Sequence, residues 1–136
     1  MSSSPQFIAT VKNPSVSFAN ADTSNFKTVL AAGSLGSRID ALIGTNTDTS
    51  NAYVIQLAVQ ISGVNYIVGE VTIPIGSGTN GSAKSVAVLN STDIPGLAYT
   101  ENGALYLASG SSLMAKSKTT VAGSNTVQLL GIAGDY

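Results

Sequence analysis

The chain contains no cysteine, no histidine and no tryptophan among its 136 residues, and only 10% of the residues are charged. Without cysteine there is no disulfide framework and no thiolate metal site. Without histidine the chain lacks the commonest general base and the commonest neutral metal ligand, which excludes a Ser-His-Asp or Cys-His arrangement. The seven acids and six bases form no basic cluster, so nucleic-acid binding is not expected.

The sparse charge is itself informative, because an ordinary domain has about 25% charged residues. Ser, Thr, Asn and Gly take the place of the missing charged residues. A neighbouring subunit can cover such a surface without desolvating many ions. We therefore expect an assembling protein, with a weakly charged monomer as the alternative. The start, Met1 to Pro5, has no cationic stretch followed by an apolar run, so no Sec-type signal peptide is expected. No apolar run approaches the ~20 residues that span a bilayer, so we expect a soluble protein made in the cytoplasm, without a membrane partner.

Short apolar runs separated by Gly-, Asn- and Ser-rich breaks predict an all-β domain. Residues 53–61 alternate with a period of two, and Ser62-Gly63 separates them from a second alternating run, so the pair is predicted to form a hairpin. The expected strands are Phe26–Ala31, Arg38–Gly44, Tyr53–Ile61, Asn65–Ile73, Lys84–Leu89, Ala104–Leu107, Leu113–Thr119 and Thr126–Ala133. About eight such strands predict one antiparallel β-sandwich over residues 22–136, jelly-roll-like by strand count, with an immunoglobulin-like strand order as the open alternative.

The first residues, Met1 to about Ala21, are rich in Ser, Asn and Pro and have only two short apolar pieces, at 7–9 and 16–18. They are interpreted as an extended N-terminal arm over residues 1–21, ordered against a partner. An edge strand followed by a loop is an equal alternative.

No residue is assigned a catalytic, cofactor-binding or metal-binding role, and we expect no enzyme and no cofactor. Asp48 lies in a polar loop with Asn46 and Asn51, but one carboxylate is too few for a calcium site, so an Asx-type turn is the better interpretation. Paired carboxylates can hydrolyse glycosides without histidine, yet nothing marks a pair, even for Asp40 and Glu70 in their predicted strands. The acids are Asp22, Asp40, Asp48, Glu70, Asp93, Glu101 and Asp135.

Three other groups of residues are candidate binding sites. The glycines at 76, 78 and 81 lack the following helix and the lysine of a phosphate-binding loop. Lys116 and Lys118 are expected to be solvated or to protect a sheet edge, with an acidic partner as the less favoured alternative. A sugar groove is conceivable for the tyrosines, but packing in the core or at an interface is favoured. These tyrosines are Tyr53, Tyr66, Tyr99 and Tyr106.

Several segments together resemble a set of small tailed-bacteriophage head proteins. The matching segments are residues 27–30, 32–33, 36–42, 47–49, 69–74 with the following glycine-rich loop 76–81, 89–97, 107–113 and 131–136. The resemblance covers nearly the whole chain from Phe26, and its motifs are turns and strand edges rather than chemical groups.

The resemblance implies a capsid decoration, or cement, protein. Proteins of that kind sit on the outside of the phage head, often as trimers at threefold positions, and lock neighbouring capsomers after expansion. It implies a homotrimer, the major capsid protein as partner, a location on the capsid surface of the virion and an N-terminal arm reaching onto the shell. The alternative function is a head-fibre or tail-associated receptor- or carbohydrate-binding module.

Overall fold

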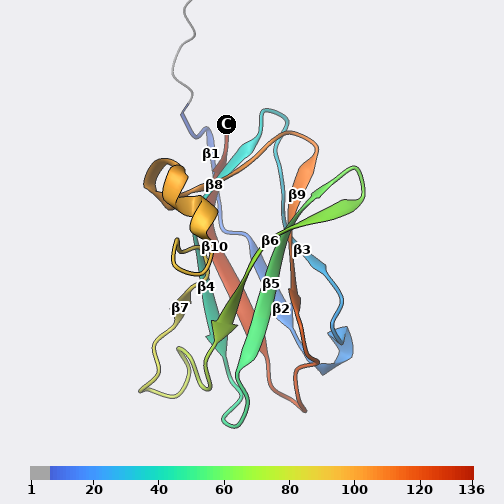
Figure 1. Cartoon of the computed structure of the whole chain (residues 1–136), viewed down its shortest axis with the longest axis vertical. Helices are drawn as coiled ribbons and strands as arrows, with labels where there is room; N and C mark the ends of the chain where they lie inside the picture. The colour runs from blue at the N-terminus through green and yellow to red at the C-terminus, as the bar shows by residue number, and fades with distance from the viewer. Residues whose placement is uncertain (1–6) are drawn as a thin grey trace, which may run out of the picture.

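The computed structural model describes residues 7–136 of the protein. These residues fold into two antiparallel sheets that pack face to face (Figure 1). Sheet A contains β1, β2, β4, β7, β8 and β10, and sheet B has the order β3-β9-β5-β6. The strands are β1 (Thr10–Lys12), β2 (Ser15–Phe18), β3 (Lys27–Ala31), β4 (Ser37–Asn46), β5 (Tyr53–Ile61), β6 (Val64–Ile73), β7 (Val86–Ala87), β8 (Leu105–Leu107), β9 (Ser111–Ser117) and β10 (Val127–Asp135). The all-β sandwich expected from the sequence is confirmed.

The strand pairing is nested, as in a jelly roll. Strand β2 pairs with β10, β3 with β9, β4 with both β7 and β8, and β5 with β6. Two further pairings complete the sheets: β10 also pairs with β4, and β9 also pairs with β5. The chain therefore crosses between the two layers repeatedly, from β2 to β3, β3 to β4, β4 to β5, β6 to β7, β8 to β9 and β9 to β10. This nested order decides for the jelly roll over the immunoglobulin-like order.

The core lies between the sheets and is built from every second residue of the long strands. In β5, Ile55 and Leu57 are fully buried, while Gln56 between them is only partly covered. Strand β10 contributes Val127 and Leu129, and β9 contributes Leu113 in the same way. The period-two pattern in the sequence is therefore the cause of the two-layer packing.

The β5–β6 hairpin is bent by a bulge. Leu57 pairs with Gly69 but Ala58 pairs with Ile67, which leaves Val68 as the extra residue. A bulge bends the strand that carries it and increases its twist, and the end of the hairpin extends away from the body at the upper right of Figure 1. Ser62 and Gly63 both have positive φ, at 51° and 79°, as a two-residue type I′ turn requires.

The first residues differ from the expected arm. Residues 10–12 and 15–18 both pair with β10, and Val16 and Phe18 belong to the core. The proposed boundary at Ala21 is therefore wrong for residues 10–18, which follow the edge-strand alternative. They pair with β10, and Val16 and Phe18 bury their side chains in the core, whereas Val11 is exposed. Residues 1–6 of the expected arm lie outside the described residues.

The stretch from Asn90 to Gly103 contains two short 3₁₀ helices, η2 (Pro95–Tyr99) and η3 (Glu101–Gly103). A third, η1 (Asn20–Asp22), follows β2. Proline at the first turn of η2 suits a helix start, since its missing N–H would be unpaired there in any case.

Candidate assembly surfaces

Asp48 is the centre of a buried hydrogen-bond network rather than a ligand-binding loop. Its carboxylate accepts hydrogen bonds from the Tyr53 hydroxyl at 2.6 Å, from the backbone N–H groups of Ser50 and Asn51 at 2.8 and 3.0 Å, and from the Asn51 side chain at 3.1 Å. The Tyr53 hydroxyl in turn accepts the N–H of Ala122 at 2.9 Å. The expected Asx-type turn is confirmed, because protein donors already occupy both oxygens.

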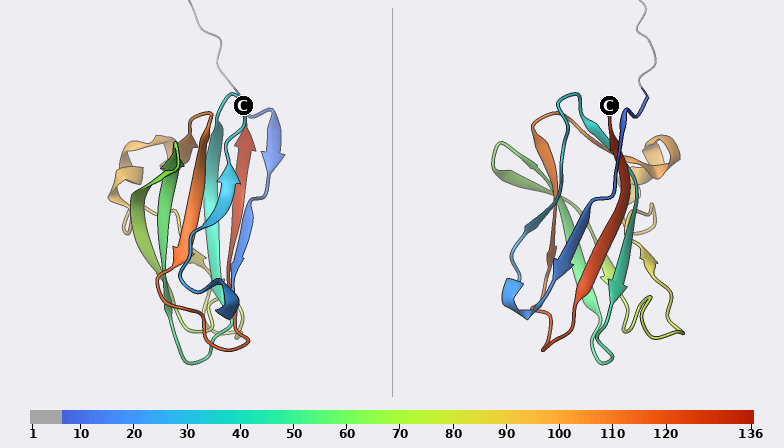
Figure 2. Two further views of the ribbon diagram at one scale, coloured as in Figure 1. Left: turned by 90° about the vertical axis from the view of Figure 1, so that its right-hand side faces the viewer. Right: turned by 180° about the vertical axis from the view of Figure 1, so that it is seen from behind.

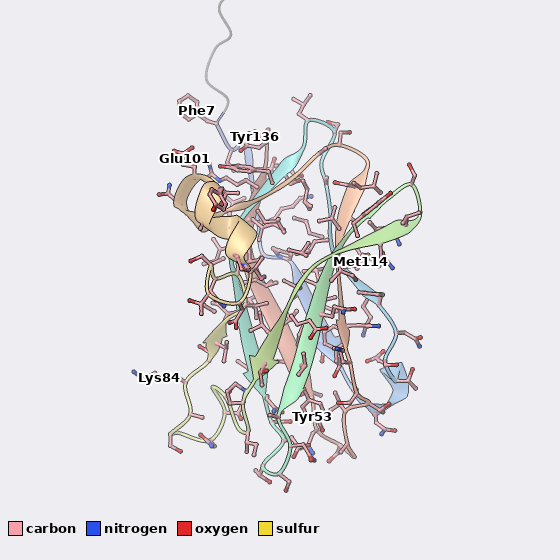
Figure 3. All side chains as sticks on the ribbon, viewed as in Figure 1. Phe7, Tyr53, Lys84, Glu101, Met114 and Tyr136 are labelled. Atoms are coloured by element: carbon pink, nitrogen blue, oxygen red, sulfur yellow. The ribbon has the colours of Figure 1, made fainter. Side chains whose placement is uncertain are left out.

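These contacts control the ionisation of the pair. The hydrogen bond from Tyr53, together with those from Ser50 and Asn51, lowers the pKa of Asp48 to about 2. Burial raises the pKa of the Tyr53 hydroxyl, and its bond to Asp48 acts in the same direction. Tyr53 lies at the lower end of the sandwich (Figure 3). Its hydroxyl links the loop with Asp48 to the loop with Ala122, so its role is structural.

The structure does not bring Asp40 and Glu70 together. Asp40 lies in sheet A and forms an ion pair with Arg38, whose Nε is 2.9 Å from Oδ1. Glu70 lies in sheet B, where the Lys118 ammonium at 2.8 Å lowers the pKa of its carboxyl. Each acid therefore has its own base. Within residues 7–136, no three Asp or Glu side chains gather in a way that could hold a metal ion.

The two lysines do not protect a sheet edge, because β9 lies between β3 and β5. The Lys116 ammonium lies over the Phe26 ring, 4.9 Å from its centroid, and Lys118 pairs with Glu70. The edge-protecting interpretation was wrong because sequence alone did not place β9 within its sheet.

The glycine-rich segment 74–82 forms turns without a strand, as expected, and is tied to the loop that follows β4. The N–H of Asn46 donates to the carbonyl of Ser77 at 3.0 Å, and that of Gly76 donates to the carbonyl of Asp48 at 2.9 Å. Thr79 donates its hydroxyl to the carbonyl of Asn46 at 2.7 Å. The segment therefore supports the Asp48 loop.

The tyrosines do not form one groove. Tyr53 is buried in the core, as favoured from the sequence, whereas Tyr66 lies on the β5–β6 hairpin. Tyr99, on η2, is 93% exposed, and Tyr106, on β8, lines a small polar hollow together with Asp40 and Asn102.

The outward face of sheet A is apolar in the middle of its two central strands, β4 and β10, which face the viewer in the right panel of Figure 2. Leu130 and Ile132 are 50% and 49% exposed there, and their partners on β4 are Ile43 and Ala41. Ala87 of β7 extends the row beside Ile43. We call these five residues the sheet A patch.

No charged residue lies in residues 41–47 or 119–134, the stretches of β4 and β10 that carry the sheet A patch. A strand with one solvated face ordinarily alternates apolar core-facing side chains with polar outward ones. The apolar outward side chains here therefore give this part of the face the character of a covered one. The polar face of sheet B is the contrast, since Gln56, Glu70 and Lys116 stand side by side on it.

The end of the β5–β6 hairpin is the second uncovered apolar surface. Ile61, Val64, Tyr66 and Ile67 are 49%, 52%, 56% and 54% exposed, and we call them the hairpin tip. The tip is apolar on both faces, because Ile61, Val64 and Tyr66 continue the inward row of the strands while Ile67 pairs with the outward Ala58. Residues 53–69 contain no charge.

Within the described part of the chain, no helix is long and apolar enough to cross a membrane. No protein-family model matches the chain, and no curated protein matches it.

Solved structures give distant likenesses. Two are pentameric capsid proteins isolated from metagenomic phage sequences. The first has 16% identity and a TM-score of 0.42 over 96% of this chain and 71% of that one, and the second has 18% identity and 0.42 over 90% and 61%. A third is the nucleoplasmin-like N-terminal domain of Drosophila FKBP39, with 16% identity and a TM-score of 0.41 over 94% and 93%. Likenesses at this level do not identify a function for the chain.

Proposed function

We propose that this protein is a structural component of a bacteriophage virion, and within it a capsid decoration protein that binds the outside of the head and stabilises contacts between capsomers. The proposal includes the major capsid protein as partner, self-association as a homotrimer, no enzymatic activity and synthesis in the host cytoplasm. It draws on the resemblance of residues 26–136 to small phage head proteins and on the surfaces of the molecule.

The observation that carries the proposal is the sheet A patch, which is apolar and uncharged. Leu130 and Ile132 stand half exposed in the middle of a rigid sheet, where a protein that works alone would present polar side chains. Covering such a face desolvates no ions, and many copies on one particle make modest individual contacts effective through multivalency.

In this proposal the segment of residues 1–7 is the part of the expected arm that reaches the shell, because Ala9 already donates its N–H to the Asp135 carbonyl at 2.8 Å. Phe7 is 81% exposed, and an extended segment can add main-chain hydrogen bonds to a partner's sheet edge. Its deletion leaves β1 and β2 in place, unlike deletion of the whole expected arm, which removes Val16 and Phe18 from the core.

The test is co-sedimentation of the purified protein with expanded, undecorated head shells of the phage that carries the gene, with unexpanded shells as the control. Saturable binding to expanded shells and greater heat resistance of the decorated shells are expected. Absence of binding would overturn the proposal. A variant lacking residues 2–7 should bind more weakly, and unchanged binding would remove the arm from the mechanism.

A receptor- or carbohydrate-binding module is the second candidate, favoured by the polar hollow beside Tyr106. Arg38, Asp40, Glu101 and Asn102 complete its lining, and an aromatic ring beside polar groups suits a sugar. A glycan array probed with the protein and with Tyr106→Ala tests it. Signals lost in the variant would support this candidate, and an array without signals would remove it.

A further inference from the structure

The sheet A patch and the hairpin tip belong to opposite sides of the same molecule. In the left panel of Figure 2 the sandwich is seen edge-on, with β6 on one side and β10 on the other. The patch lies on the outward face of sheet A, and the tip belongs to the hairpin at the edge of sheet B. One protomer therefore cannot cover its own patch with its own tip.

We propose that the hairpin tip of one copy packs on the sheet A patch of the next copy, in a head-to-tail contact that closes into a ring. Two different surfaces of one chain that meet in this way make a heterologous interface, which generates rings when the rotation closes. The proposal rests on the proposed function only for the expectation that copies gather around an axis.

Charge distribution favours these two surfaces as partners. Neither surface contains an acid or a base. The ion pair of Arg38 with Asp40 lies on β4 at the margin of the patch, next to Ala41, and another pair, Glu70 with Lys118, lies farther away in sheet B. Contact through the outward face of sheet B would have to desolvate the Glu70–Lys118 pair and Lys116. Contact between tip and patch places no ion at its centre and therefore avoids the desolvation cost that opposes contact through the outward face of sheet B.

The exposed area also agrees with a stable contact. Side chains of this size expose on the order of 150–200 Å² when free, so the half-exposed tip leaves roughly 350 Å² of apolar area. The patch and the neighbouring Val11, which is exposed and pairs with Gly134, together leave about the same apolar area exposed. An apolar share of about 60% then implies an interface of about 1,200 Å² in total, the lower end of the range for specific contacts.

The test uses the full chain without shells, and native mass spectrometry with light scattering measures its mass. The wild-type protein should form a multiple of the 13.7 kDa protomer. Tyr66→Lys alters the tip and Leu130→Lys alters the patch, and each should be monomeric, because an unpaired ammonium at the contact weakens it by roughly 100-fold. Thr72→Lys, on the exposed outer face of β6, is the matched control and should assemble normally.

Mixing the two altered proteins separates this geometry from others. Each variant keeps one intact surface, so a one-to-one mixture of Tyr66→Lys and Leu130→Lys should give a heterodimer that cannot grow, while neither protein associates alone. A face-to-face contact between two patches would instead leave Tyr66→Lys dimeric, and this result would overturn the proposal. So would a mixture that stays monomeric.

A wild-type protein that is monomeric at high concentration would also overturn the head-to-tail contact. It would leave the proposed function standing if the same protein still bound expanded shells, and then a shell subunit rather than a second copy would cover the patch. Circular dichroism and thermal melting of each variant check that the fold is intact. The altered side chains Tyr66 and Leu130 are about half exposed in the protomer, so an intact fold is expected.

Discussion

Replacing Tyr53 by phenylalanine removes one hydroxyl and two buried hydrogen bonds. The hydroxyl donates to Asp48 and accepts the N–H of Ala122, and the ring is 3% exposed, so water cannot easily replace either partner. Loss of a hydrogen bond to a charged group costs about 1.5–3 kcal/mol, and a neutral one about 1 kcal/mol. We expect the free energy of unfolding to fall by about 3 kcal/mol, which lowers Tm by about 10 °C for a domain of this size.

The pH dependence gives a sharper measurement. Because the pKa of Asp48 is lowered to about 2 in the folded protein and is about 3.9 when unfolded, its ionisation stabilises the fold fully above about pH 4. That contribution is lost as the pH falls toward 2. In Tyr53→Phe the pKa of Asp48 lies closer to its ordinary value, so the variant loses less stability on acidification.

Urea unfolding of both proteins between pH 2 and 7 is the assay. The two curves of unfolding free energy against pH should converge as the pH falls, since other carboxyls with lowered pKa values, such as Glu70 and Asp135, are common to both proteins. Parallel curves would refute the assignment of the Tyr53 hydroxyl as the main stabiliser of the Asp48 carboxylate. A destabilisation below about 1 kcal/mol would refute the burial argument.

Two glycines lead to further predictions, with Gly96→Ala as their shared control, because a methyl group there meets no atom within 4 Å. A Cβ at Gly44 would lie 2.5 Å from Ile73 Cδ1 and 3.1 Å from Val88 Cγ2, so Gly44→Ala should lower the free energy of unfolding by about 1–2 kcal/mol in urea titrations. Gly63 has open space but a φ of +79°, so Gly63→Ala should cost about 1 kcal/mol through backbone strain. Equal stability of all three variants would contradict both arguments.

The sequence predicted the strands well where an alternating pattern extends over several residues. All eight expected strands are present, and the hairpin turn at Ser62 and Gly63 is where the spacing placed it. Strands β1 and β2 were expected as an arm because they are short and their partner β10 lies at the other end of the chain. The alternation of Val16 with Phe18 was the available signal, but pairing between distant segments is not visible in a local pattern.

The assembly surfaces were only partly predictable. Sparse charge predicted an assembling protein, but not which face is uncovered. The run from Leu129 to Ala133 carried a usable signal, because a strand that is apolar on both faces is typical of one covered on both sides. The hairpin tip required knowledge of the bulge at Val68, which places Ile67 on the outward face of the hairpin and Tyr66 in the inward row.

The position of β10 also determines the order in which the molecule can be built. Strand β10 lies between β2 and β4 in sheet A, so the first-made strands of that sheet have no neighbour until nearly the whole chain has been synthesised. Contacts between such distant segments make folding slow, because the long loop between them must close first. Until then Val16 and Phe18 of β2 and the edge of β4 that faces β10 lack their partner strand. During translation the nascent chain would therefore be open to aggregation and to chaperone binding, and the patch forms only in the last step of folding.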